Sequence, residues 1–461
     1  MNPFESSPFK TTDSHRVLSI YLVVLYFVSI LTIYIFLNNN YRPHDIDDVW
    51  SLSFIYNYLH YGSLGDICFG GYGNGIGFFG KIHAFLVGHL LNLLGYTKTS
   101  AHLLSILFLG IGLGIWGVFL GRLGIRRDLR VIFLLCAPLF EPFFTAATST
   151  RTEAFEFMLC ALSALLFTRR NYFLSMLVLW IGIESHPIGV VGFFYLAAAF
   201  IAQPADHPLL VQKPRQGWIG LVLGFALGFA LFCFLHTQIL GSFPAILAGK
   251  NSPDGTIALG PLFDYFFRTK YLRHLPEFLL FLLAIVIFGA KKIYRAEKGI
   301  RALLLATMAA ALFIHRPNFH YTLFFYPALL LVTIKVADTL RLLKPLLILF
   351  LALLIPQYAF VYEQNRDFNF SREIQVMKES IPKDGLPVLG PPNAWFAFYD
   401  RPFFHQGYDT GLQDLGLGTF YLITDPHWPL EKEANRKWLE ATCRSIQNLP
   451  ASGSNFTFEK I

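Results

Sequence analysis

Long apolar runs separated by short polar segments dominate residues 17–362 of the chain. Most of them approach the length of about 20 residues that a helix needs to cross the hydrocarbon core of a bilayer. We therefore expect an all-α polytopic membrane protein of about 11 transmembrane helices, at 17–37, 100–120, 130–148, 153–168, 172–184, 187–203, 217–240, 276–290, 301–315, 321–340 and 345–362.

The pattern changes after residue 362, where the chain becomes polar. A helix is predicted at 372–381, then a Pro-Lys-Asp-Gly turn, strands at 386–389 and 419–424, and a second helix at 430–446. Short strands between helices and turn residues are typical of a small α/β unit. The sequence thus predicts two domains, a transmembrane domain at 1–362 and an α/β domain at 363–461.

Composition supports a membrane protein. Hydrophobic residues make up 54% of the 461 positions, charged residues only 15%, and the mean hydropathy is +0.49. Soluble domains usually carry about a quarter charged residues. The net charge of +7 is spread over short loops rather than gathered on one polar domain. A lipid bilayer is therefore the expected partner, and nucleic acid is excluded.

The basic residues also give an orientation. With the N-terminus in the cytoplasm, the inner segments hold about twice as many Lys and Arg residues as the outer segments before residue 363. This orientation makes the C-terminal domain extracytoplasmic and gives the protein a large first outer loop, at about 38–99. Within that loop the apolar run 82–94 is too short to span, so we expect a helix lying at the interface.

An acidic cluster follows the first span, where Asp45, Asp47 and Asp48 occupy three of the four positions 45–48. One interpretation is ordinary, because acids are favoured near the start of a helix. The other is chemical, because neighbouring carboxylates raise one another's pKa and one of them then suits a general base. The Asp-x-Asp spacing also leaves a divalent cation, Mg²⁺ or Mn²⁺, as a candidate cofactor. The five cysteines show no metal-binding spacing.

Other polar residues fall on the same predicted outer side. Arg151 and Glu153 begin the fourth span, His186 follows the fifth, and Arg316, His320 and Tyr321 precede a late one. Each group has an ordinary interpretation, as a neutralised helix start, a tight turn or interfacial anchoring. Because ionisable residues at this depth are costly, their gathering predicts a site at the outer boundary between lipid and water.

The order of these motifs resembles that of the polytopic C-type glycosyltransferases, the group of the protein O-mannosyltransferases and the lipid A aminoarabinose transferase. Asp47-Asp48 followed by Gly62 is similar to the acidic pair and glycine of that family. Thr150-Arg151-Thr152-Glu153-Ala154 is similar to its Arg-Pro-Glu-Ala, and Ser185-His186-Pro187-Ile188-Gly189 to its His-Pro-x-Gly. The second Asp replaces the family's usual Glu, and its paired prolines are absent here.

The resemblance implies transfer of a sugar from a polyprenyl-phosphate donor to a glycan, lipid or protein acceptor on the outer face, with inversion, in glycosylation of the cell envelope. Asp47 is the implied general base, with Asp48 or Asp45 positioning the acceptor or a cation; which of Asp45 and Asp47 carries the proton stays open. The implied substrate-binding residues are Lys81, His83, His102, Arg151, Glu153, His186, Arg268, Arg316, His320 and Tyr321.

Two other functions remain as alternatives. A transporter or flippase for lipid-linked glycans requires ionisable groups near the middle of the membrane and related halves of the chain. The sequence shows neither feature, because its charged groups gather at the predicted outer edge. The second alternative is a non-catalytic subunit in the assembly of envelope glycans, for which replacement of Asp47 and Arg151 would be without effect.

Overall fold

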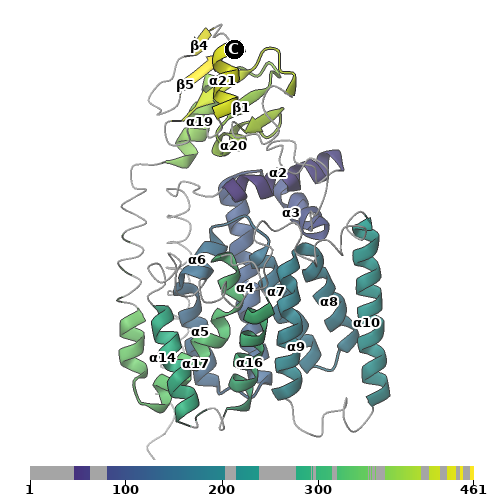
Figure 1. Cartoon of the computed structure of the whole chain (residues 1–461), viewed down its shortest axis with the longest axis vertical. Coiled ribbons are helices and arrows are strands. Elements are labelled where there is room, and N and C mark those ends of the chain that lie inside the picture. Colours follow the sequence, from purple (N-terminus) through teal and green to yellow (C-terminus); the bar gives the residue numbers. More distant parts are fainter. Residues whose placement is uncertain are drawn as a thin grey trace, which may run out of the picture.

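The computed structural model describes residues 46–62, 80–202, 214–237, 277–291, 293, 297–313, 319–350, 352, 355, 359, 369–405, 415–425, 433–442, 447–449 and 457–461. Figure 1 shows three tiers: a bundle of long helices, two helices at one end of it, and a small sheet beyond them. The expected span at 17–37 lies outside the described residues.

The bundle helices follow the predicted spans closely. They are α4 (Lys98–Arg122), α7 (Glu153–Thr168), α8 (Tyr172–Ser185), α9 (Val191–Ala202), α10 (Pro214–Leu235), α14 (Glu277–Ala290), α16 (Lys298–Phe313) and α17 (Tyr326–Thr339), and residues 343–350 are also helical. By length and composition, α4 and the Gly217–Leu235 part of α10 are sufficient to cross a membrane. Exposed Val222, Leu223 and Phe234 give α10 an apolar outer surface suited to lipid.

Small polar side chains join some of these helices. Ser163 of α7 donates a hydrogen bond to the carbonyl of Ser175 on α8 at 2.7 Å, and Ser175 returns one to the carbonyl of Ser163 at 2.9 Å. Both serines are fully buried. Hydrogen bonds between helices stabilise packing where lipid cannot supply a hydrophobic driving force.

One predicted span is not a continuous helix. Instead of a helix over 130–148, the chain forms α5 (Arg127–Cys136), a 3₁₀ turn η1 (Ala137–Leu139) and α6 (Glu141–Ala147). Pro138 and Pro142 stand at these breaks, and proline supplies no N–H for a helical hydrogen bond. The prediction of a single span here was wrong because these prolines divide an otherwise largely apolar segment.

The loops predicted to be cytoplasmic meet at one end of the bundle. Arg126, after α4, forms an ion pair at 2.9 Å with Asp338 near the end of α17. Lys335 of α17 pairs at 2.9 Å with Glu297, which precedes α16. The basic segments that the sequence assigns to a common side are thus neighbours in the structure.

Two helices cover the opposite end of the bundle, and we call them the cap helices. They are α2 (Ile46–Tyr61), which runs across the long axis of the bundle, and α3 (Lys81–Leu94) beside it (Figure 1). They pack tightly, since a Cβ added to Gly88 of α3 would lie 3.2 Å from side-chain atoms of both Ile55 and Leu59 of α2. The short helix expected at 82–94 is confirmed as α3.

The C-terminal part contains a five-stranded mixed sheet of order β2-β1-β3-β5-β4. Strands β2 (Phe403–His405), β1 (Val388–Gly390) and β3 (Tyr421–Thr424) are parallel, whereas β5 (Thr457–Lys460) is antiparallel to β3 and to β4 (Gln447–Leu449). Helices α19 (Phe370–Ser380), α20 (Trp395–Phe398) and α21 (Glu433–Thr442) accompany the sheet. The predicted strands at 386–389 and 419–424 correspond to β1 and β3.

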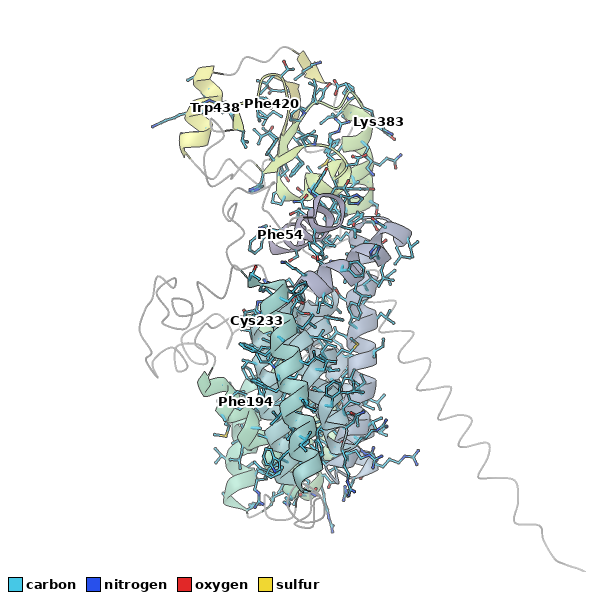
Figure 2. The ribbon with its side chains drawn as sticks, turned by 90° about the vertical axis from the view of Figure 1, so that its right-hand side faces the viewer. Phe54, Phe194, Cys233, Lys383, Phe420 and Trp438 are labelled. Carbon is cyan, nitrogen blue, oxygen red and sulfur yellow. The ribbon has the colours of Figure 1, made fainter. Side chains whose placement is uncertain are left out.

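Four aromatic rings join the sheet region to the cap helices. Tyr399 lies 5.5 Å from Tyr56 of α2 and 5.3 Å from Tyr96, measured between ring centroids, and Trp395 lies 6.4 Å from both tyrosines. We call this the aromatic junction. In Figure 2, Phe54 of α2 lies between Phe194 and Cys233 in the bundle and Phe420 and Trp438 near the sheet.

Asp384, in the turn before β1, fastens that turn to β3. Its carboxylate accepts hydrogen bonds from the Tyr421 hydroxyl at 2.5 Å and from the Leu386 N–H at 3.1 Å. Partial burial opposes ionisation of Asp384, but these bonds and the charge of Lys460 outweigh it and lower its pKa. Burial and the bond to Asp384 raise the pKa of Tyr421 to about 12.

The lowered pKa of Asp384 predicts a contribution to stability that depends on pH. Such a carboxylate stabilises the fold above its unfolded pKa of about 4, and the contribution is lost as the pH falls through the folded value. We expect Asp384→Asn to unfold at a lower temperature than the wild type at pH 7, and the two proteins to converge below about pH 4. Thermal unfolding across pH checks this, with Glu440→Gln as an exposed control; a difference independent of pH would contradict the assignment.

Candidate functional site

Polar side chains from five elements converge at the capped end of the bundle. They come from the start of α3, the start of α7, the end of α8, the end of α10 and the 3₁₀ turn η4 (Phe319–Phe324). Five ionisable residues there are buried: His83, Glu153, Glu156, Glu184 and His236. Burying ionisable groups is costly unless they are paired, so each needs a structural or chemical reason.

Glu184 holds together three of these elements. One of its carboxylate oxygens accepts the Lys81 N–H at 2.7 Å and lies 2.8 Å from His236 Nε2, and the other accepts the Ile82 N–H at 3.1 Å. The Glu184 carbonyl accepts the Gly80 N–H at 2.6 Å. Since the first N–H groups of a helix have no partner within it, a carboxylate there satisfies them and complements the helix dipole. Glu184 thereby fixes the start of α3 on the bundle.

Gly80 allows the backbone before α3 to lie close to the end of α8. Its φ is +103°, and an added Cβ would lie 3.1 Å from the Ser185 carbonyl oxygen. We expect Gly80→Ala to destabilise the protein by about 1–3 kcal/mol, because alanine is strained at this φ and displaces the contact with α8. Thermal unfolding in detergent measures the effect. Gly114→Ala, where an added Cβ meets nothing within 4 Å, is the control and would stay near the wild-type value.

Two predicted substrate-binding residues lie on the first turn of α3. The Lys81 ammonium donates a hydrogen bond to the carbonyl of Leu235, the last residue of α10. His83 is buried, with its ring centroid 5.3 Å from that of Phe155. Burial lowers the pKa of His83 to about 4, against an opposing effect of the Glu153 charge. His83 is therefore a neutral imidazole at pH 7, which excludes it as a fixed positive charge.

The start of α7 carries one cation and two acids, which we call the α7 cluster. Arg151 Nη2 lies 2.8 Å and Arg151 Nε 2.9 Å from one oxygen of Glu153. Glu156, one turn further, is fully buried, and within the described part of the chain neither of its carboxylate oxygens has a hydrogen-bond partner. Arg151, Glu153 and Glu184 all lie within electrostatic range of Glu156. The cluster is thus continuous with Glu184.

His186 and Tyr321 meet beside this group. Nδ1 of His186 accepts the Ile188 N–H at 3.1 Å, and Nε2 lies 3.5 Å from the Tyr321 hydroxyl. The helix break predicted at Pro187 is present as the 3₁₀ turn η2 (Pro187–Val190). The η2 turn orients the His186 ring towards η4. The structure thus brings together His186 and Tyr321, which were both predicted as substrate-binding residues. His102, also predicted, is buried on the first turns of α4.

The acidic cluster of the sequence is only partly described. Asp47 and Asp48 lie in the first turn of α2, which is the helix start that one of the two interpretations expected. Asp45, Arg268 and Arg316 lie outside the described residues. The backbone of His320 belongs to η4. Among the described side chains, no group of three His, Cys, Asp or Glu residues has the placement of a metal site.

Sequence reasoning missed the buried partner of Glu184. His236 directly follows the last residue of α10, after a long apolar run, and its side chain, like that of Glu184, is 2% exposed. A histidine ending an apolar span was a signal of a buried polar contact, but nothing in the spacing linked it to residue 184. Glu184 and Glu156 were likewise not among the predicted site residues.

Comparison with known proteins bears on this arrangement. No protein-family model matches the sequence, and no curated protein sequence matches it. The structure is similar to that of ArnT from Cupriavidus metallidurans bound to undecaprenyl phosphate, with a TM-score of 0.61 and 12% sequence identity over 95% of this chain and 98% of that chain. The chain therefore has the fold of this ArnT.

The apo structure of the same ArnT gives a similar result, with a TM-score of 0.56 and 11% identity over 96% of this chain and 98% of that chain. The similarity in fold therefore extends over nearly the whole chain. At this level of identity the similarity shows a common fold of a polytopic membrane protein, and residue roles have to be argued from the chain itself.

Proposed function

We propose that the protein transfers a sugar from a polyprenyl-phosphate donor to an acceptor at the outer face of a cell membrane. One observation carries the proposal: the similarity over almost the full length to an ArnT structure that holds undecaprenyl phosphate. The convergence of Lys81, Arg151, Glu184 and His186 at the capped end supports a polar site at the place where a lipid phosphate would enter.

The reaction makes two demands on that site. The acceptor hydroxyl or amine attacks the anomeric carbon and loses its proton, while the bond from that carbon to the phosphate oxygen breaks and polyprenyl phosphate leaves. A carboxylate suits the first task, and we assign it to Asp47 with Asp48 or Asp45 beside it. A single displacement inverts the anomeric configuration, because no enzyme nucleophile takes part.

The leaving phosphate requires preorganised positive charge. Arg151 and Lys81 are two cations at the capped end of the bundle, and in the structure both are held, Arg151 by Glu153 and Lys81 by the end of α10. We propose that these contacts position the two side chains and are exchanged in part for phosphate oxygens when the donor binds. His186, through Tyr321, is proposed to orient the donor sugar, with Arg268, Arg316 and His320 contributing to the same surface.

The proposal includes a division of the chain and an orientation. Residues 1–362 form the transferase domain and residues 363–461 an extracytoplasmic domain, with the N-terminus in the cytoplasm. The ion pairs that join the basic loops at the end of the bundle opposite the cap helices support this orientation, because positive loops stay inside.

The test is a transfer assay with the purified protein in lipid. Radiolabelled polyprenyl-phosphate sugars are supplied with membrane extracts as acceptors, and we expect label in a new product together with release of polyprenyl phosphate. A transporter would instead move the intact donor between leaflets of sealed vesicles. Movement of donor with no cleavage of its sugar–phosphate bond would refute the proposed function.

A further inference from the structure

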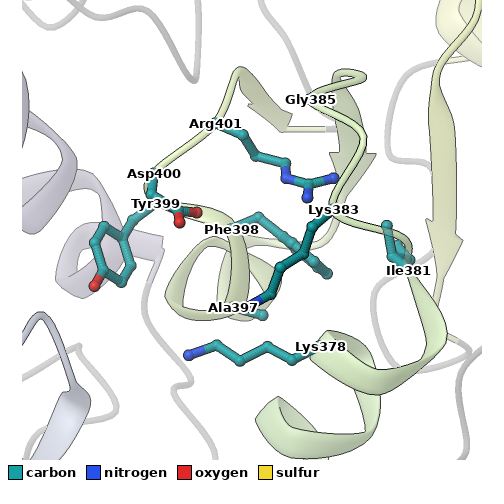
Figure 3. Close-up of a pocket in the computed structure, with 9 residues that line it drawn as sticks. All are labelled: Lys378, Ile381, Lys383, Gly385, Ala397, Phe398, Tyr399, Asp400 and Arg401. Atoms are coloured by element: carbon teal, nitrogen blue, oxygen red, sulfur yellow. The ribbon is translucent and has the colours of Figure 1, made fainter.

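A cavity of about 290 Å³ opens in the sheet region, next to the cap helices. Its wall is formed by the end of α19, the turn before β1, and the end of α20 with the segment that follows it (Figure 3). The turn follows the predicted Pro-Lys-Asp-Gly sequence, and Gly385 takes the φ of +79° that it requires. The polar side chains that line the cavity are Lys378, Lys383, Asp400 and Arg401. We call it the Arg401 pocket.

The Arg401 pocket carries excess positive charge. Three cations face one carboxylate, and within the described part of the chain neither Lys378 nor Lys383 has an ion-pair partner. Arg401 is held in place, because its Nη2 donates to the Pro382 carbonyl at 3.1 Å and its guanidinium carbon lies 5.5 Å from the centroid of the Phe398 ring. Its Nη1 is buried with no hydrogen-bond partner among the described residues. An unsatisfied donor of a held guanidinium thus lies beside two exposed ammonium groups.

This set of groups matches a phosphate group carried by a sugar. A fixed guanidinium and flexible ammonium groups are the usual donors to phosphate oxygens. Asp400 supplies acceptors for hydroxyl groups, which inorganic phosphate alone would leave unused. The volume corresponds to roughly ten water molecules, enough for a sugar phosphate and too small for a lipid chain. We propose that the Arg401 pocket binds a phosphorylated sugar.

The place of the pocket connects it with the transfer reaction. Tyr399 lines the pocket, and its ring points away from the basic side chains towards the cap helices (Figure 3). There it joins the aromatic junction with Tyr56 of α2, the helix whose first turn carries Asp47. Resting on the proposed function, the bound sugar phosphate is part of the acceptor, held near the helix that bears the proposed base.

The test measures binding alone, without donor. The full-length protein in nanodiscs of neutral lipid is titrated with a hexose 6-phosphate, the unphosphorylated hexose and inorganic phosphate. We expect the hexose phosphate to bind most tightly, the neutral hexose not to bind, and affinity to fall with ionic strength, because the lysines are exposed. The double variant Lys378→Ala/Lys383→Ala is expected to raise the Kd of the hexose phosphate about tenfold. Arg401→Lys keeps the positive charge but loses the planar set of guanidinium donors. This variant should bind the hexose phosphate more weakly although Lys378 and Lys383 are unchanged.

The control is Arg372→Ala, which removes an exposed cation of α19 outside the pocket and should leave the Kd unchanged. Unfolding temperatures show that each variant is folded. Equal affinity for the hexose and its phosphate, or an unchanged Kd in the double variant, would overturn the proposal, as would displacement of the sugar phosphate by vesicles containing phosphatidic acid. If the protein transfers sugar but does not bind the hexose phosphate, the proposal for the Arg401 pocket is wrong and the proposed function stands. If it binds the hexose phosphate but transfers no sugar, the proposed function is wrong.

Discussion

Replacing Asp47 by Asn is expected to reduce sugar transfer by about 10²- to 10⁴-fold, the range that a general base contributes. Asparagine has the size of aspartate and accepts hydrogen bonds, but it takes no proton from the acceptor. Position 47 lies in the first turn of α2, where asparagine is also compatible with a helix start. The variant should therefore fold and bind donor while its turnover falls.

The measurement is the transfer rate in membranes supplied with lipid-linked sugar at saturating concentration. Glu379→Gln is the matched control, since it removes an exposed carboxylate of α19 that accepts a hydrogen bond from Gln375. Asp45→Asn and Asp48→Asn, assayed in parallel, decide which acid of the cluster takes the proton. Transfer at the wild-type rate in Asp47→Asn would refute Asp47 as the general base. If Asp45→Asn lost transfer instead, Asp45 would be the base.

The second large effect concerns Glu184. Changing it to Leu leaves the first N–H groups of α3 and the buried His236 without their partner, so we expect destabilisation of about 3–5 kcal/mol, the usual result when one member of a buried pair is removed. Glu184→Gln keeps an acceptor oxygen for α3 and should lose less. The order of unfolding temperatures, wild type above Gln above Leu, tests this role in detergent solution.

A control separates this effect from the general one of removing a charge. Glu440 lies 3.9 Å from Arg436 on the exposed face of α21, and Glu440→Leu should cost less than about 1 kcal/mol. Removing both groups, in Glu184→Leu with His236→Phe, should recover part of the loss because no buried histidine is then left without its partner. If the double variant were as unstable as Glu184→Leu, the contact with His236 would contribute little, and the cost would lie in the start of α3.

Most of the bundle could be predicted from the sequence, because uniformly apolar runs of sufficient length have few alternatives to a buried or membrane helix. The limits of α7 and α8 were predicted almost to the residue, since Arg151 and Asn171 mark their starts with polar groups. The division of 130–148 was missed, because the apolar pattern alone does not show which prolines interrupt a helix. Strands β2, β4 and β5 were also missed, since three- and four-residue strands lack a readable alternation.

The sequence indicated where polar residues would gather better than it indicated which residues contact one another there. Arg151, Glu153, His186, Lys81 and Tyr321 were selected as polar residues at one predicted boundary, and the structure brings them to one end of the bundle. The contacts of Glu184 join residues about 50 and 100 positions apart. No local pattern encodes such pairings, because they depend on how α8, α10 and α3 pack.

The broken segment from α5 to α6 also constrains how the protein is made. Around the 3₁₀ turn Ala137–Leu139 the prolines leave main-chain groups outside the regular helical pattern, and Ala137 and Pro138 are buried among the other helices. In a bilayer such backbone is tolerated only where protein surrounds it. Residues 127–147 therefore have no stable state as an isolated segment facing lipid, and their insertion should be completed only when later helices such as α17 have emerged from the ribosome and closed around them.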